Sequence, residues 1–140
     1  MSLAREVPRR ADRQKIDVKI GAGITKATHA NKGYAVVLDV ATAVGKYEGK
    51  LPVVLSGTTA GLPIVGELLD VNDMTKEGSV EVRDMMLRGD AAYDKANNGK
   101  VLGTHTVSGV TAAADTLKAG PVLFGGFTEG TDHYYRAVRL

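Results

Sequence analysis

The stretch SGTTAGLPIVGELLDV (Ser56–Val71) contains Gly61 and Gly66 with four residues between them. That spacing is the skeleton of the phosphate-binding loop G-x-x-x-x-G-K-[ST], in which the lysine contacts the phosphates and the hydroxyl residue contacts Mg²⁺. Here Glu67 takes the place of the lysine and Leu68 that of the hydroxyl residue. Because a carboxylate repels phosphate, we interpret the glycines as turn and bulge positions of a sheet.

The residues between and after these glycines are apolar, and we expect them to be buried in a strand. They are Ile64, Val65, Leu68 and Leu69. Outward from this stretch the chain shows further short runs rich in valine and isoleucine, several with period-two alternation, bounded by glycine, proline and asparagine. About eight strands are predicted; they lie within residues 15–20, 34–41, 50–57, 62–71, 78–84, 97–110, 121–127 and 133–140.

Other segments have weaker patterns. Residues 84–97 (DMMLRGDAAYDKAN) are the best helix candidate, although Gly89 interrupts them. Residues 21–33 read as a loop with one short strand, and residues 111–120 as a loop or a single helical turn. Asn98-Gly99 is a hairpin-turn signal. Pro52 near the start of its strand suggests an edge or first-residue position.

The fold class predicted from this pattern is mainly β, a small antiparallel β-sandwich or barrel with at most one short helix. The 140 residues favour a single domain, here 15–140, preceded by an extended N-terminal arm, 1–14. Hydrophobic residues make up 44% of the chain and charged residues 24%, which is typical of a globular domain rather than a disordered chain.

Composition also excludes several kinds of chemistry. The chain has no cysteine, which rules out disulfide scaffolds, thiolate zinc sites and cysteine nucleophiles. No apolar run reaches the roughly 18 residues needed for a membrane-spanning helix. The N-terminus lacks the apolar segment of a secretory signal, so synthesis and use in the cytoplasm is the default expectation.

Positive charge is concentrated in the arm. Residues 1–20 carry a balance of +3, although the whole chain carries only +2. Arginine-rich arms can contact nucleic-acid phosphates, but the rest of the chain is not basic and does not interleave aromatic with basic residues. We therefore favour an acidic protein surface as the partner of the arm, and nucleic acid is not expected; a solvated tail without a role is the remaining alternative.

Searches for a catalytic or metal-binding pattern are negative. The segment beginning at Asp94 fails the calcium-loop pattern at two ligand positions, Ala96 and His105. His29, His105 and His133 show no metal-ligand spacing, and no serine lies in a G-x-S-x-G elbow. Neither an enzymatic activity nor a cofactor or metal is predicted. Arg88-Gly89-Asp90 is interpreted as a chance match to an integrin-type signal.

A pattern of strands and turns gives the chain a resemblance to a known family. KLPVVLSGTTAGLPIVGELLDV is followed by GSVEVRD, then NNGKVLG, then a final alternating strand. This order resembles the capsid cement proteins, or head decoration proteins, of tailed bacteriophages, over roughly residues 15–140. The resemblance rests on turn and strand patterns, and the long basic arm is not part of the match. The resemblance nevertheless implies an N-terminal arm that reaches along the major capsid protein.

The resemblance implies a structural protein of the virion, made in the host cytoplasm and placed on the outer capsid surface. Its partners would be the major capsid protein and further copies of itself, with a homotrimer favoured and a dimer possible. It would stabilise the expanded head without catalysis, cofactor or membrane contact. The alternatives that stay open are a small β-barrel module that binds nucleic acid or a small ligand, and a tail or baseplate structural protein.

Arginine and tyrosine are residue types enriched at protein interfaces, and they occur at both ends of the chain. The arginines of the arm and the last strand, HYYRAVRL, are therefore the predicted capsid-binding residues. For the two tyrosines, simple alternation into and out of the sheet is an equally good interpretation. The predicted residues are Arg5, Arg9, Arg10, Arg13, Tyr134, Tyr135, Arg136 and Arg139.

Overall fold

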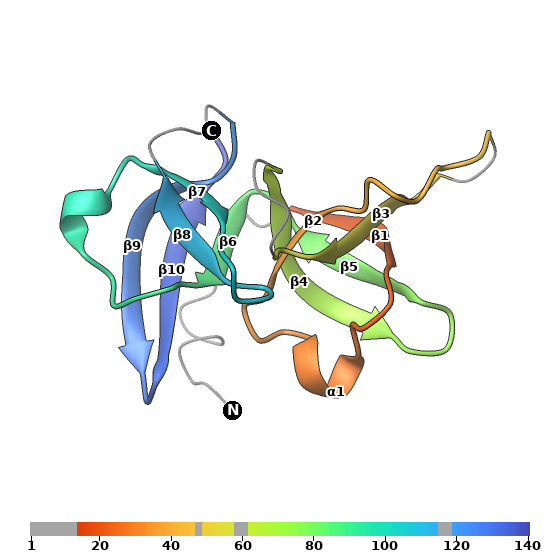
Figure 1. Cartoon of the computed structure of the whole chain (residues 1–140), viewed down its shortest axis with the longest axis horizontal. Coiled ribbons are helices and arrows are strands. Elements are labelled where there is room, and N and C mark those ends of the chain that lie inside the picture. Colours follow the sequence, from red (N-terminus) through yellow and green to blue (C-terminus); the bar gives the residue numbers. More distant parts are fainter. Residues whose placement is uncertain (1–13, 47–48, 58–61, 115–118) are drawn as a thin grey trace.

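The protein is described here from a computed structural model, and the structure describes residues 14–46, 49–57, 62–114 and 119–140. Within them the chain is mainly β, as the sequence predicts, and forms two sheets that lie side by side (Figure 1). The strands of the first sheet are β1 (Lys15–Ile20), β2 (Ala35–Leu38), β3 (Leu51–Leu55), β4 (Ile64–Asn72) and β5 (Glu77–Glu81). The strands of the second are β6 (Asp84–Arg88), β7 (Val101–Thr104), β8 (Thr111–Ala114), β9 (Val122–Glu129) and β10 (Asp132–Val138).

The first sheet is a closed barrel with the strand order β1-β3-β2-β4-β5. All neighbours in it are antiparallel except β1 and β3, which run parallel. Buried aliphatic side chains fill its interior: Val18, Ile20, Ile24, Val36, Val53, Leu68, Val71 and Val80. Closure leaves no edge, so the edge position suggested by Pro52 is wrong; Pro52 is the second residue of β3, between β1 and β2.

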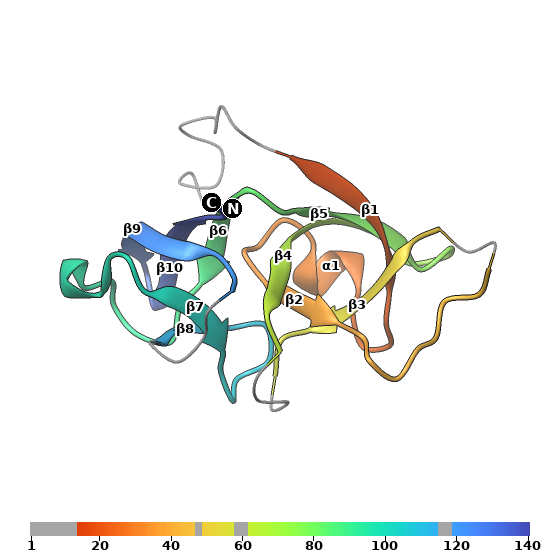
Figure 2. The same ribbon diagram turned by 90° about the horizontal axis from the view of Figure 1, so that it is seen from above.

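The second sheet has the order β6-β10-β9-β7-β8. Its inner face packs against the outside of β2 and β4, so the two sheets share one core cluster. That cluster contains Ala35, Val37 and Ile64 from the barrel and Met85, Leu87, Leu102, Leu123, Tyr135 and Ala137 from the second sheet. Figure 2 shows the same arrangement from above, with β4 nearest to the second sheet. The packing contact between the sheets is therefore mainly apolar.

Strand β4, which holds most of the opening stretch, carries two register shifts. Val36 pairs with Gly66 and Val37 with Ile64, which leaves Val65 as an extra residue; a second shift leaves Leu69 extra between Leu68 and Asp70. Bulges of this kind bend a strand and re-aim its side chains. The bulge interpretation of the glycine-containing stretch is thus confirmed at Gly66, and Gly61 lies outside the described residues.

Gly66 is required by close approach. A Cβ built there would lie 2.1 Å from the carbonyl oxygen of Glu81. Of the four residues expected to be buried, Ile64, Leu68 and Leu69 are, and Val65 is half-buried. The segment therefore builds the barrel wall, because only glycine lets β4 approach β5 this closely.

Three segments differ from the sequence-based expectation. Residues 84–97 do not form a helix: Asp84–Arg88 is strand β6, and Lys95–Asn97 is a single 3-10 turn, η2. Residues 111–114 form β8 rather than a loop or helical turn. Residues 21–33 contain the four-residue helix α1 (Lys26–His29) and no strand. Pairing of β6 with β10, which is remote in sequence, overrides the weak local preference of the first segment, and β8 pairs with the preceding strand β7.

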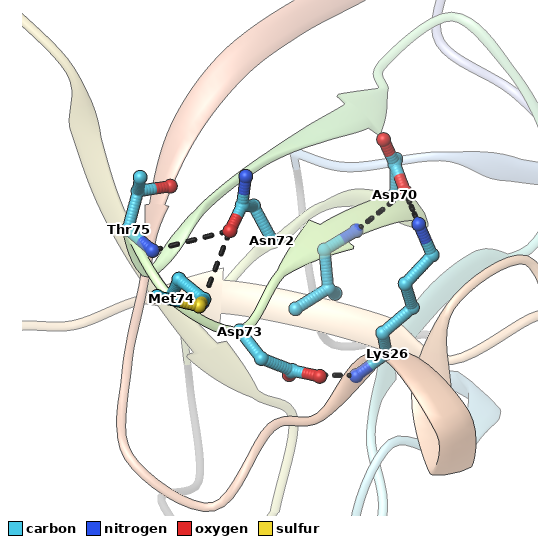
Figure 3. A network of polar contacts seen from close by, with 7 residues as sticks. Lys26, Asp70, Asn72, Asp73, Met74 and Thr75 are labelled. Atoms are coloured by element: carbon cyan, nitrogen blue, oxygen red, sulfur yellow. Dashed lines mark hydrogen bonds and ion pairs between the residues drawn. The ribbon is translucent and has the colours of Figure 1, made fainter.

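The turn between β4 and β5 is fixed to α1 by polar contacts (Figure 3). The side-chain amide oxygen of Asn72 accepts hydrogen bonds from the backbone N–H groups of Met74 and Thr75. Asp73 accepts from the backbone N–H of Lys26, whose ammonium group lies 3.8 Å from Asp70. These contacts hold the turn in place and tie α1 to one end of the barrel.

Asn98-Gly99 is a turn but does not join two paired strands. Gly99 has a φ of 89°, and the N–H of Lys100 donates to the carbonyl of Asn97, as in a type II turn. The turn connects η2 to β7, whose antiparallel partners are β8 and β9.

Among the described residues, no helix is long and apolar enough to cross a membrane.

Candidate partner-binding surfaces

The predicted capsid-binding residues fall into two groups. Arg5, Arg9, Arg10 and Arg13 lie outside the described residues. The chain is described from Gln14 onward, whose backbone N–H donates to the carboxylate of Glu81 at 2.7 Å and whose carbonyl accepts from Val82. Residue 14 is thus part of the barrel's hydrogen bonding, and the boundary of the arm at this position stays a prediction.

Tyr135 points into the core shared by the two sheets. It is 5% exposed, and its hydroxyl oxygen lies 2.8 Å from the carboxylate of Asp90 and 2.9 Å from the carbonyl oxygen of Ala91. Burial, and secondly the hydrogen bond to Asp90, raise the pKa of Tyr135 to about 12. Asp90 of the Arg88-Gly89-Asp90 sequence is therefore a partner of the core tyrosine.

Tyr134 faces the opposite side of the sheet but is covered as well, at 4% exposed. Phe127 of β9 stacks on its ring at 5.1 Å, and the guanidinium of Arg88 lies 5.6 Å from the ring centre. The two tyrosines alternate into and out of the sheet, as the second interpretation proposed. Both rings are covered, so a partner that bound this region would contact other residues.

Arg88 connects the two sheets. Its guanidinium lies 4.5 Å from the centre of the Tyr34 ring, opposite its contact with Tyr134. It also donates to the carbonyl of Lys32 at 2.8 Å and to Asp132 at 3.2 Å. The planar guanidinium is suited to simultaneous stacking and hydrogen bonding. Arg88 is therefore a structural residue that joins β6 to the segment before β2.

The remaining two predicted residues, in β10 and just after it, make different contacts. Arg136 is half-buried, with its guanidinium 5.1 Å from the ring centre of Phe124, which is 43% exposed. Arg139 donates a hydrogen bond to the carbonyl of Ile64 at 2.6 Å, and burial lowers its pKa. Arg136 with Phe124 thus offers a partly exposed surface, and Arg139 mainly ties the end of the chain to β4.

The three histidines lie in separate structural settings. His29 accepts the N–H of Thr25 and packs edge-on against Tyr34; burial is the largest cause of its lowered pKa. His105 accepts the N–H of Val107, and His133 bonds to the hydroxyl of Thr128. Within the described part of the chain, no cluster of three or more histidine or acidic side chains could hold a metal ion.

Four of the eight exposed large apolar side chains of the described residues lie in or next to the loop between β2 and β3, of which residues 39–46 and 49–50 are described. We call these residues the β2–β3 loop. Val40 is 66% exposed and Val44 is 47% exposed, and Leu38 and Leu51 at its two ends are also exposed. Figures 1 and 2 both show this loop projecting away from the barrel, on the side opposite the second sheet.

A hollow of about 280 Å³ lies at the base of this loop. The lining includes Val44 and Pro52 together with the ion pair of Lys50 and Glu77. Apolar surface with a charged rim is the usual composition of a protein–protein contact. This site is not predicted from the sequence, because Val40 falls within the expected strand 34–41. The available signal is the pair of valines, Val40 and Val44, spaced among small residues after the last paired position of β2.

Comparison with known proteins gives no further guide to the role of these surfaces. The sequence matches no protein family and no curated protein.

Proposed function

We propose that the protein is a structural protein of a phage virion that binds the outer surface of the capsid shell and stabilises it as a cement. The observation that carries this proposal is the β2–β3 loop, with Val40 and Val44 exposed on a projection beside a hollow. Exposed apolar side chains grouped on one projection favour contact with another protein. The mainly β fold fits the resemblance to head decoration proteins.

The proposed contact has two parts. The loop supplies apolar anchors, and the arginines of the arm supply charge that can pair with acidic residues of the shell. Each contact can be weak, because many identical sites on one shell hold the bound layer in place collectively. The role needs no catalysis and no cofactor.

A small ligand inside the barrel is the less favoured alternative. The eight buried aliphatic side chains of the barrel interior occupy the space that a ligand would need. Five strands enclose a narrow interior, which side chains fill even in barrels of about eight strands. A tail or baseplate location would use the same kind of surface, so the choice between head and tail is left to experiment.

The test is binding of the purified protein to phage particles that lack it. We expect saturable co-sedimentation with expanded heads and a higher temperature of head disruption when the protein is bound. Binding to isolated tails but not to heads would move the proposal to the tail. Failure to bind either particle, with head stability unchanged, would remove the proposed function.

The loop can be tested by replacing both exposed valines with aspartate, V40D together with V44D. We expect head binding to fall by about tenfold or more, because truncation of central apolar anchors costs about 1 kcal/mol or more each. The matched control is Val107→Asp, since Val107 is also exposed but lies in the connection between β7 and β8. Equal losses for the loop variant and the control would show that the loop is not the contact.

A further inference from the structure

Strand β9 has an outer edge, on the side away from β10, where few backbone groups are paired. β9 and β10 form a hairpin in which Glu129 pairs with Asp132 across a two-residue loop. The two residues that flank such a loop exchange both of their backbone hydrogen bonds with each other. At the next residue of each strand, and at every second residue after it, the backbone N–H and C=O groups point away from the partner strand. The hydrogen bond from Gly89 N–H to the carbonyl of His133 confirms the alternation, because it places the His133 carbonyl on the side of β10 away from β9.

The same alternation applies to β9. Opposite His133 lies Thr128, and opposite Tyr135 lies Gly126. The backbone N–H and C=O groups of Thr128 and Gly126 therefore point away from β10, toward the outer side of the sheet. We call this outer side of residues 126–128 the β9 edge.

Among the residues that the structure describes, no strand pairs with the β9 edge. β7 meets β9 only at Val122, and Leu123 exchanges backbone hydrogen bonds with Gly99 and Lys100. Figure 1 shows the β9–β10 hairpin extending beyond the rest of the sheet. Unpaired strand edges bind other strands readily, because their N–H and C=O groups match those of any extended backbone.

We propose that the β9 edge pairs with the same edge of a second copy, so that the protein forms a dimer with one sheet continuous across both copies. Two identical strands pair antiparallel about a twofold axis, which a self-complementary edge satisfies. With the axis at Phe127, Gly126 of each copy faces Thr128 of the other. Each of these two facing pairs can exchange two backbone hydrogen bonds.

The side chains of β9 suit this register. Phe127 already stacks on Tyr134, and at the axis the two Phe127 rings would be cross-strand neighbours, a favourable aromatic pair. Gly125 and Gly126 carry no side chains of their own, and the neighbouring side chain at Gly126 is Tyr93, which packs against it. Glu129 would face Gly125 of the second copy, so no like charges are opposed. Any extended strand could use the backbone groups of the edge, and the aromatic pair and the absence of opposed like charges are what favour a second copy of the chain.

The decisive pair of variants is Thr128→Pro and Thr128→Val. Proline removes the outward N–H of residue 128 and costs no hydrogen bond to β10, since prolines are tolerated at such edge positions. Valine keeps the N–H and removes only the hydroxyl that contacts His133. Light scattering and sedimentation of the full chain should show dimers for the wild type and for Thr128→Val.

For Thr128→Pro the dimer dissociation constant should rise by about tenfold to a hundredfold, because one N–H donor per copy is lost. At protein concentrations low enough for both variants to be monomeric, its thermal unfolding should follow that of Thr128→Val, because dimerisation itself stabilises the folded state. A monomeric wild type at high protein concentration, a trimer, or equal dimerisation of the two variants would overturn the proposal.

Hydrogen exchange of the wild-type protein gives a readout that does not depend on the proline variant folding. The amide protons of Gly126 and Thr128 should exchange more slowly as protein concentration rises, while that of Thr75, in the turn between β4 and β5, should not change. Exchange at Gly126 and Thr128 that is rapid at every concentration would overturn the proposal.

Discussion

Glu67 on β4 lies directly opposite Glu81 on β5, and both side chains are fully buried. Both carboxylates accept hydrogen bonds from backbone N–H groups at the junction of the two sheets. Glu67 accepts from Met86 of β6 at 2.8 Å, and Glu81 accepts from Gln14, Arg83 and Asp84 at 2.7, 3.0 and 3.2 Å. The carboxyl groups thus fix the start of β1 and the crossing from the barrel to the second sheet.

Replacing Glu67 tests this linkage. We expect Glu67→Ala to lower the free energy of unfolding by about 3 kcal/mol, since it leaves the Met86 N–H without this acceptor and opens a cavity. Glu67→Gln keeps an oxygen acceptor and should cost about 1 kcal/mol. Urea unfolding measures both. The control is Glu77→Ala, an exposed acid, with an expected loss below about 1 kcal/mol; equal losses for Gln and Ala would contradict the role.

Tyr135 should make stability fall at alkaline pH. Its pKa is raised from 10.0 in the unfolded chain to about 12 in the folded one, mainly by burial. Between these values the unfolded state loses a proton that the folded state keeps, so rising pH favours unfolding. The stabilisation is complete below pH 10 and is lost as the pH passes through 12.

The comparison that isolates this effect is Tyr135→Phe. The variant should be about 1 kcal/mol less stable at pH 8, because it loses the hydrogen bonds of the hydroxyl. Its unfolding free energy should then decline less steeply above pH 10 than that of the wild type. Parallel pH profiles for the two proteins would show that Tyr135 ionises alike in both states.

Arg88 should contribute to stability through shape as well as charge. Arg88→Met removes two ring contacts and the hydrogen bonds to Lys32 and Asp132, and we expect a loss of about 2 to 3 kcal/mol in unfolding free energy. Arg88→Lys keeps the charge but not the planar group, and should recover less than half of the loss. Arg136→Met, at a more exposed ring contact, is the control for removing an arginine from this sheet.

Gly66 should tolerate no side chain. Gly66→Ala places a Cβ 2.1 Å from the carbonyl oxygen of Glu81, and overpacking of this kind costs about 1 to 3 kcal/mol or more. At Gly57 the nearest atom to an added Cβ is 4.0 Å away, so Gly57→Ala should leave stability nearly unchanged. Thermal unfolding compares the two, and similar melting temperatures would contradict the close approach of β4 and β5.

The local sequence pattern was enough to predict the strands whose apolar residues alternate and the turns that contain typical turn residues such as asparagine and glycine. The segment KIDVKI is β1 as predicted, because Val18 and Ile20 enter the barrel while the lysines stay outside. The turn after Asn72 and the bulge at Gly66 also follow from residue type. The mainly β class was predictable because such runs recur along the whole chain, with turn residues between them.

Local pattern failed where a partner remote in sequence determines the outcome. The segment DMMLR has helix-forming residues, yet it is β6 because β10, some fifty positions later in the chain, supplies its hydrogen bonds. Glu81 alternates with Val80 and Val82 along the sequence, a pattern of solvent exposure, yet it is fully buried because the backbone N–H groups of Gln14, Arg83 and Asp84 surround its carboxylate.

The candidate surfaces show the same division. The arginines and tyrosines of the last strand were predictable as candidates from residue type alone. In the structure, the register of β10 places Tyr135 in the core, and Phe127 and Arg88 cover Tyr134. The exposure of Val40 and Val44 and the unpaired β9 edge depend on which segments pack against them. Periodicity and turn chemistry are properties of neighbouring residues, so the amino-acid sequence specifies them directly. Burial, barrel closure and open edges are properties of pairs of distant segments, and only the folded chain establishes them.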